Sequence, residues 1–419
     1  MQLKKKSIKG MTLALLMLMA AMAGCIGTED ETTDEGEEAK PAFLDASDAG
    51  YTYASDVDNH RSLMQDLCDI KSAASDSNWD EAKNIYTNGK NAEKSDGSFR
   101  TLAGFAAASG KNHNYDTFYG QDGAIGAHIM AAMDGTGDFE GASDTVRYQG
   151  IAKLTANMGM VGYTIHELNA AVAKADAGNT DNDSGAPHNW DEGWAFFHGP
   201  DEHWSCSPAY TMKKRAADYG TETNGVSNAL AASEQAMVDG LAALQAGDKA
   251  GYDAATETVI KNIIITYSQA TLKYTMKMDS NESAAKYQAE GYAFWKTMEA
   301  YAAPHTDGCY NMQVHKVFMM GDIDASTCDA FMWTQHQGQG DFMCYNTVTH
   351  QVSTDVSNET ECDGYSNATF MDMYGADKIN EILNLKDASK HGTSYDIAPH
   401  LERVWAHYGI TAEDIGTYQ

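Results

Sequence analysis

Apolar residues recur every three or four positions over many stretches of the 419-residue chain, which is the spacing of an amphipathic helix. This spacing predicts helices over 57–74, 79–86, 122–133, 143–175, 189 onward, 226–244, 251–278, 280–301, 372–387 and 397–408. Stretch 89–119 is rich in Gly, Ser, Asn and Lys, and we expect it to be irregular. The six prolines and many Ala, Leu and Met residues agree with an all-α protein.

An internal repeat lies within this pattern. Residues 191–197 read DEGWAFF and residues 289–295 read AEGYAFW, and each copy follows a long helical stretch. We interpret the repeat as a duplicated helix pair, and we expect acids from the two copies to meet inside one bundle. The alternative is that two unrelated helices both use glycine and aromatic residues for close packing.

The chain is predicted to divide into five parts. These are a signal peptide that ends in a lipobox (1–24), a lipidated cysteine with a disordered acidic tether (25–50), a first helical repeat unit (51–220), a second helical repeat unit (221–302), and a Cys-rich lobe with C-terminal helices (303–419).

The N-terminus has the pattern of an export signal. Four lysines among the first nine residues precede an apolar run over 11–23, which is too short to span a membrane well. Cys25 follows directly after small residues, as in a lipobox. We therefore expect a lipid on Cys25 that anchors the protein to the outer face of the cytoplasmic membrane, at the cell surface or in the periplasm. An ordinary cleaved signal with an incidental cysteine is the alternative.

Without Cys25, six cysteines remain. An even number in an exported chain indicates disulfides. Four of the cysteines fall within 309–362, so we expect that segment to be stapled internally, with a short hairpin over 342–352. Cys68 and Cys206 are then left to pair with each other. The absence of a CxxC pair argues against a zinc ribbon or a thioredoxin-type site.

The chain is strongly acidic, with 29 Lys and Arg against 60 Asp and Glu and a formal net charge of −31. Such a surface repels nucleic acid and attracts cations, although most of this charge serves solubility. The sequence has no G-x-S-x-G elbow, P-loop, HExxH pair or Rossmann glycine pattern. We therefore expect no nucleic acid partner and no enzyme of these classes.

The stretch 188–203, HNWDEGWAFFHGPDEH, gathers acids, histidines and aromatic residues. His188 and Glu192 are four residues apart and share one face of a helix, and Asp191 lies beside them. Upstream, His166 and Glu167 lie inside an apolar run, where a carboxylate is rarely buried without a partner.

The second copy of the repeat offers Glu290. Hard cations prefer carboxylate oxygens, imidazole also suits iron, and bundles that hold iron place such groups on facing helices. The candidate metal ligands are therefore His166, Glu167, His188, Asp191, Glu192 and Glu290. The competing interpretations are a hydrogen-bonded core histidine for His166 and, for Glu167 and Glu192, a helix-end hydrogen bond or a buried ion pair. The basic residues that could supply such an ion pair are Arg147, Lys153, Lys174 and Arg215.

Four stretches together resemble the iron-assimilating, low-iron- or high-CO2-inducible periplasmic proteins of green algae. They are YTNGKNAEKSDGSFRTLAGFA (86–106), GTGDFEGASDTVRYQGIAK (135–153), YTIHELNAAVAKADAG (163–178) and HNWDEGWAFFHGP (188–200). The resemblance implies an exported, mostly helical, iron-binding protein that helps capture iron at the cell surface. The lipobox and the 303–365 lobe depart from that family. The imelysin-type iron-uptake proteins rank lower, because their Gly-x-His-x-x-Glu signature is absent.

Three functional hypotheses remain. The first is a lipid-anchored protein that binds iron, as ferric iron, through carboxylates inside a helix bundle and passes it to a transporter. The second is a structural or adhesive surface protein whose inward acids are all paired with basic residues. The third is a carboxylate-bridged ferroxidase, which needs two metals about 3.5–4 Å apart.

Overall fold

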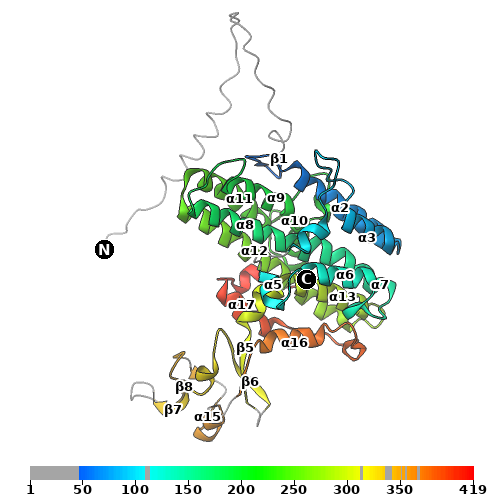
Figure 1. Ribbon diagram of the computed structural model, residues 1–419. Helices are drawn as coiled ribbons and strands as arrows, with labels where there is room; N and C mark the ends of the chain where they lie inside the picture. The colour runs from blue at the N-terminus through cyan, green and yellow to red at the C-terminus, as the bar shows by residue number, and fades with distance from the viewer. Residues whose placement is uncertain are drawn as a thin grey trace, which may run out of the picture. The chain divides into compact units, whose positions relative to one another are not determined.

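The computed structural model describes residues 47–108, 114–311, 315–335, 342–350, 352–353, 356–365 and 369–419. The predicted signal peptide, Cys25 and almost all of the predicted tether lie outside these ranges. The described part is mostly helical, as predicted (Figure 1). Its helices are α2 (Asp58–Ser75), α3 (Trp79–Asn88), α4 (Leu102–Ala106), α5 (Asn114–Tyr119), α6 (Ala124–Asp134), α7 (Asp144–Lys153), α8 (Met160–Asp176), α9 (Ala186–Phe197), α10 (Pro208–Tyr219), α11 (Asn228–Ala246), α12 (Lys249–Met276), α13 (Ala284–Ala302), α14 (Ala325–Cys328), α15 (Glu359–Tyr365), α16 (Tyr374–Ile382), α17 (Ala398–His407) and α18 (Ala412–Ile415).

The predicted helix over 143–175 is present but interrupted. The Ser143 side chain accepts a hydrogen bond from the Val146 backbone N–H and so caps α7. Residues Leu154–Gly159 form a π-helical turn between α7 and α8. Such turns widen a helix locally and are frequent at functional sites. The apolar period continues through the turn, so the sequence pattern does not reveal it.

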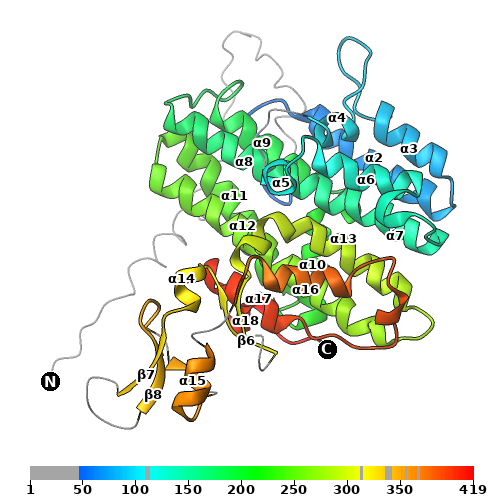
Figure 2. The same cartoon turned by 60° about the horizontal axis from the view of Figure 1, so that its bottom comes forward.

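Two helix pairs correspond to the predicted repeat. Helix α8 packs along α9, and α12 packs along both α11 and α13 (Figure 2). The repeated glycine lies at a close contact in both pairs. A Cβ on Gly193 would lie 3.2 Å from Leu168 of α8, and a Cβ on Gly291 would lie 3.4 Å from Tyr274 of α12 and 2.8 Å from Leu383, just after α16. Part of the repeat is therefore explained by close helix packing.

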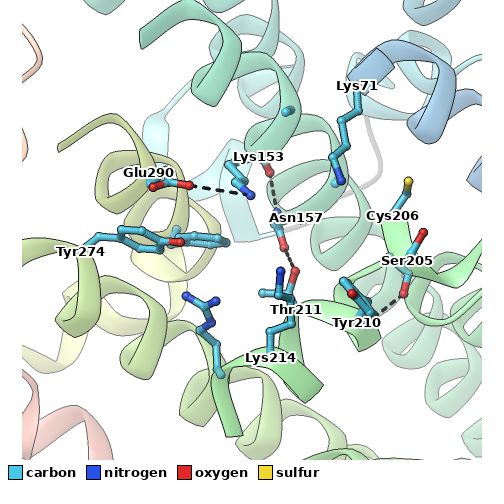
Figure 3. Close-up of a pocket in the computed structure, with 15 residues that line it drawn as sticks. Lys71, Lys153, Asn157, Ser205, Cys206, Tyr210, Thr211, Lys214, Tyr274 and Glu290 are labelled. Atoms are coloured by element: carbon cyan, nitrogen blue, oxygen red, sulfur yellow. Dashed lines mark hydrogen bonds and ion pairs between the residues drawn. The ribbon is translucent and has the colours of Figure 1, made fainter. Parts of the chain in front are cut away.

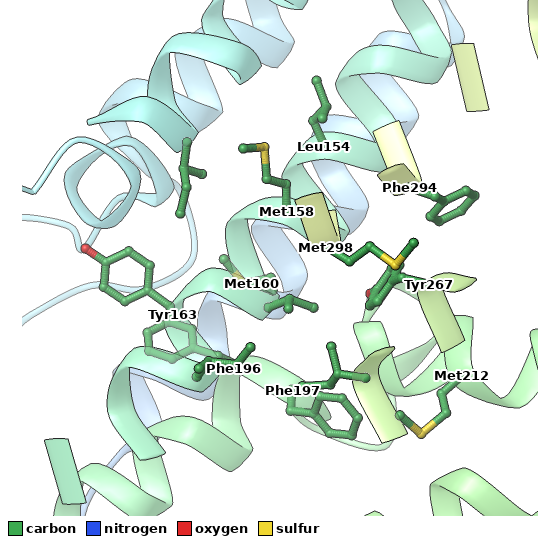
Figure 4. Close-up of a cluster of buried hydrophobic side chains, with 14 of the residues drawn as sticks. Leu154, Met158, Met160, Tyr163, Phe196, Phe197, Met212, Tyr267, Phe294 and Met298 are labelled. Carbon is green, nitrogen blue, oxygen red and sulfur yellow. The ribbon is translucent and has the colours of Figure 1, made fainter. Parts of the chain in front are cut away.

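Both pairs contribute to one hydrophobic core. Figure 4 shows Met160 and Phe196 from the first pair in the same cluster as Tyr267, Phe294 and Met298 from the second. These side chains are almost fully buried. This shared core fixes the position of α9, which carries the central sequence stretch.

Two expectations about helix positions were partly wrong. Stretch 89–119 contains the short helices α4 and α5, which span too few turns to show a period. Thr101 caps α4 by accepting a hydrogen bond from the Gly104 N–H. Helix α9 begins at Ala186 instead of residue 189, with Pro187 in its first turn. Proline is tolerated there because backbone N–H groups in the first turn have no partner within the helix.

The cysteines pair as predicted. Cys68 is bonded to Cys206, and the segment over 309–362 holds the Cys309–Cys328 and Cys344–Cys362 disulfides. The latter two stabilise a lobe with two small antiparallel sheets, in the orders β10-β5-β6 and β7-β8-β9. Their strands are β5 (Asp307–Asn311), β6 (Lys316–Gly321), β7 (Phe331–Gln335), β8 (Phe342–Asn346), β9 (Val352–Ser353) and β10 (Thr369–Met371). The β8–β9 pairing confirms the predicted hairpin.

Two further two-stranded antiparallel sheets lie outside the lobe. They are β1 (Ser47–Asp48) with β2 (Tyr51–Thr52), and β3 (Glu222–Thr223) with β4 (Val226–Ser227). Within the described ranges, none of the helices combines the length and the apolar character that crossing a membrane would require.

Candidate metal site

Glu192 lies between two histidines. Its Oε1 atom is 3.2 Å from Nε2 of His188, one turn earlier on α9, and 3.3 Å from Nε2 of His60 on α2. The Glu192 side chain is 13% exposed and that of His60 is 4% exposed. The expected helical spacing of His188 and Glu192 is therefore confirmed, and packing of α2 on α9 adds a second imidazole.

A second carboxylate reaches Glu192 from the facing helix. Glu167 on α8 is 5% exposed, and a hydrogen bond between the Glu167 and Glu192 carboxyl groups contributes to the low pKa of Glu192. Asn189 Nδ2 donates a hydrogen bond to Glu167 Oε2. The expected antiparallel packing of α8 and α9 thus brings the two glutamates together. We call His60, Glu167, His188 and Glu192 the His–Glu cluster.

The two histidines of the cluster differ in protonation. Burial outweighs the opposing charge of Glu192 and, with smaller contributions from the charges of Arg100 and His188, lowers the pKa of His60 to about 4, so its imidazole is neutral at pH 7. Burial acts to raise the pKa of Glu192, but its hydrogen bond with His188 and the charges of both histidines outweigh this and lower it. The hydrogen bond with Glu192 raises the pKa of His188. A neutral imidazole and a carboxylate are the forms that bind metals.

Asp191 stands behind the cluster and not in it. Its Oδ1 accepts a hydrogen bond from the Tyr51 hydroxyl at 2.6 Å. Its Oδ2 accepts from the backbone N–H groups of Ala54 and Ser55 and from the Ser55 hydroxyl, at 2.8–2.9 Å. The same hydroxyl lies 2.9 Å from Nδ1 of His188. Asp191 therefore orients His188 through Ser55, as residues behind metal ligands commonly do, and both of its oxygens are occupied.

A hollow leads to the cluster from outside. A pocket of about 310 Å³ lies beside α4 and is lined by Glu167 and Tyr163 of α8 together with Phe99, Arg100, Thr101, Gly104, Phe105 and Ala108. Phe105 also contacts the His60 ring, at 5.7 Å between centroids. Glu167 is thus the member of the cluster that lines this pocket, together with the positively charged Arg100.

The other two candidate ligands have different described neighbours. The half-buried His166 has its ring 5.8 Å from that of Tyr163. Glu290 on α13 lies 4.0 Å from Lys153 Nζ at the end of α7. No residue is common to the described ion pairs of Glu192 and Glu290. The structure therefore does not show the expected meeting of acids from the two copies.

Another group of potential ligands lies at the start of the Cys-rich lobe. Nδ1 of His305 is 2.5 Å from Asp322 Oδ1, and Nδ1 of His407 is 3.2 Å from Asp322 Oδ2. Among the described residues, this is the group of three whose ligand atoms all lie within 4.8 Å of one another, a spacing that His60, His188 and Glu192 do not meet. Asp322 and His407 are both exposed, so the group is open to solvent.

His60 is the functional candidate that sequence reasoning missed. It lies on the same face of α2 as the predicted apolar stripe, because positions 60, 63, 67 and 70 follow helical spacing. His60, Leu63, Leu67 and Ile70 are all buried. A histidine that continues an apolar stripe is a signal that could have marked His60 as facing inward.

No curated protein and no solved structure matches the chain. The family model described as low iron-inducible periplasmic protein matches residues 41–312. This range includes every member of the His–Glu cluster and more than half of the chain, and the protein therefore belongs to the family of low iron-inducible periplasmic proteins.

Proposed function

We propose that the protein binds iron in the His–Glu cluster as part of iron assimilation outside the cytoplasm. The observation that carries this proposal is the placement of one Glu192 oxygen within 3.3 Å of two imidazole nitrogens from different helices. The Glu167 carboxyl group adds a second source of oxygen ligands. Two carboxylates and two imidazoles form a donor set that suits iron, and the family's link to low iron selects iron among the cations.

Ferric iron is the form that we propose, because hard carboxylate oxygens favour it. Binding would displace the proton of His188, whose pKa is raised by Glu192 in the metal-free cluster. Iron affinity should therefore increase with pH through the range in which His188 loses its proton. The proposal includes the lipid on Cys25 and the transfer of iron to a transporter, which together would hold captured iron at the membrane.

The surface-protein hypothesis accounts for one of the two repeat glutamates. Glu290 is paired with Lys153, as that hypothesis expects. The ion pairs described for Glu192 are instead with histidines, which can release a proton and bind a metal. We also favour iron capture over iron oxidation, because carboxylate-bridged dimetal sites use more carboxylates than this cluster offers.

Iron titration of the mature chain tests the proposal. We expect Glu192→Gln to weaken iron binding by at least about tenfold, because even the loss of a residue that only orients a metal ligand commonly costs this much affinity. Glu290→Gln is the matched control, since it makes the same change in the other copy of the repeat, and we expect unchanged affinity. His407→Gln tests whether iron binds instead in the group formed by His305, Asp322 and His407.

Two results would contradict this assignment. One is equal iron affinity in the wild type and Glu192→Gln. The other is loss of iron binding in His407→Gln with full binding in Glu192→Gln, which would move the site to the Cys-rich lobe.

A further inference from the structure

A pocket near Glu290 has the opposite electrostatic character from the rest of the chain. Lysines from three helices surround it: Lys71 of α2, Lys153 of α7 and Lys214 of α10, together with Arg215 of α10. Figure 3 shows the three lysines around one space, with Glu290 to one side. We call this cavity, defined by these five residues, the basic pocket.

The lining of the basic pocket is mainly basic, whereas the chain as a whole is acidic. The whole sequence has about two acidic residues for each basic one, 60 against 29. The lining of the pocket has four basic side chains and one acidic side chain, Glu290. Like charges that converge on a shared cavity repel one another. Such an arrangement is stabilised when an anion occupies the cavity.

Arg215 provides a second, independent observation. Its residue is 5% exposed, and its Nη2 atom forms an ion pair with Asp218 Oδ2 at 3.0 Å. Its Nε and Nη1 atoms are buried and have no hydrogen-bond partner among the described residues. The guanidinium lies against the rings of Tyr274 and Phe294, at 5.5 and 5.9 Å from their centroids. Arg215 also interacts with the Tyr274 hydroxyl through a side-chain hydrogen bond. Buried polar groups normally have a partner, and Nε and Nη1 have none within hydrogen-bonding geometry.

We propose that the basic pocket is a binding site for a small oxyanion with phosphate or carboxylate oxygens. Its volume of about 180 Å³ is below the roughly 300 Å³ at which pockets for larger organic ligands begin. An oxyanion would accept hydrogen bonds from the lysines, and the positive charge of Arg215 would attract it further. The site is separate from the His–Glu cluster and does not depend on iron binding.

The state of Lys153 agrees with this assignment. Burial and the positive charges of Lys71, Arg215 and Lys214 lower the pKa of Lys153 to about 8, although the Glu290 carboxylate opposes the shift. An anion next to Lys153 would favour its charged form. Its binding should therefore take up protons near pH 8 and weaken as the pH rises through this value.

Calorimetric titration of the mature chain with inorganic phosphate, citrate and sulfate tests the site. We expect saturable binding of at least one of them, with a Kd of about 1 mM or lower. Comparison of the phosphate and citrate affinities decides between phosphate and carboxylate oxygens as the ligand class. Lys153→Gln and Lys214→Gln should each weaken binding by about tenfold, the effect of one charged hydrogen bond. Lys213→Gln is the matched control, because Lys213 and Lys214 are both exposed and only Lys214 lines the pocket.

Two further arms separate a binding role from a folding role. Glu290→Gln removes the acid of the pocket and should tighten anion binding, an effect that damage to the fold cannot produce. With sulfate, whose charge is constant above neutrality, wild-type affinity should fall about tenfold between about pH 7 and pH 9, and Lys153→Gln should remove this dependence. No saturable binding of any of the three anions, or equal binding by Lys153→Gln, Lys214→Gln and Lys213→Gln, would overturn the proposal.

Discussion

At the residue scale, the two glutamates that correspond to each other in the internal repeat have different neighbours. Glu192 and Glu290 occupy the same position in the repeat, but the residue four positions earlier is His188 in the first copy and Lys286 in the second. Only the first copy therefore places an imidazole on the face of its glutamate. The difference is visible in the sequence, and it argues against treating the two acids as equivalent ligands.

Asp191 gives the sharpest prediction at this scale. Replacement by Ala removes the acceptor for the Tyr51 hydroxyl, for the N–H groups of Ala54 and Ser55 and for the Ser55 hydroxyl. We expect the free energy of unfolding in urea to fall by about 3 kcal/mol, since several buried donors lose their partner. Iron affinity should fall by about tenfold because His188 loses its orientation. Unchanged iron affinity in a folded Asp191→Ala variant would show that this support is not needed.

The residues of the cluster differ in how far the sequence reveals them. His188, Glu192 and Glu167 could be identified because helical spacing and a short connection fix their neighbours. His60 comes from a helix far earlier in the chain, and its approach to Glu192 depends on how α2 docks. Such tertiary contacts leave no local pattern.

At the element scale, the long helices and the disulfide pairing were predictable, because periodicity and cysteine number report them directly. The π-helical turn between α7 and α8 and the separate environments of the two repeat copies were not. Both depend on how helices from distant parts of the chain pack. The repeated glycines report close packing, and sequence similarity alone could not separate packing from ligand binding.

Gly240 provides a test of the close packing of α9, α11 and α12. A Cβ at this position on α11 would lie 2.2 Å from Trp190 Cζ2 and 2.9 Å from Ala255 Cβ. Gly240→Ala should therefore destabilise the protein by about 1–2 kcal/mol, because overpacking exceeds the helix propensity gained with Ala. Gly159→Ala is the control, since the nearest atom to its Cβ would be at an ordinary 3.5 Å. Urea denaturation measures both variants, and equal stability would contradict the close approach of α9, α11 and α12.

The Cys68–Cys206 disulfide joins α2 to the segment between α9 and α10, across 138 positions of sequence. We expect the double replacement by Ser to lower the free energy of unfolding by about 2–4 kcal/mol. Thermal unfolding with and without iron measures the effect. A larger loss of iron affinity than in the Gly240→Ala variant would further indicate that docking of α2 positions His60. Unchanged stability and unchanged affinity would contradict this role.

At the scale of the whole molecule, family membership agrees with the predicted export, since the family is described as periplasmic. The family match covers both the His–Glu cluster and the basic pocket, whereas Asp322 and His407 lie beyond residue 312. A property shared by the family should therefore reside in the helical part. The lobe held by Cys309–Cys328 and Cys344–Cys362 extends beyond that match.

Iron should stabilise the whole fold, because the cluster joins α2, α8 and α9. At an iron concentration about 100 times the Kd, the stability should rise by about 2.7 kcal/mol. Glu192→Gln should show little of this gain, whereas Glu290→Gln should show all of it. Differential scanning calorimetry measures the shift, and an equal gain in both variants would locate the bound iron elsewhere.

The most direct test of iron binding in the His–Glu cluster is iron K-edge X-ray absorption of the iron-loaded mature protein. The account predicts iron with oxygen ligands and two imidazoles, and the loss of one imidazole contribution in His188→Gln. A wild-type spectrum without imidazole scattering, or one that His188→Gln leaves unchanged, would contradict it.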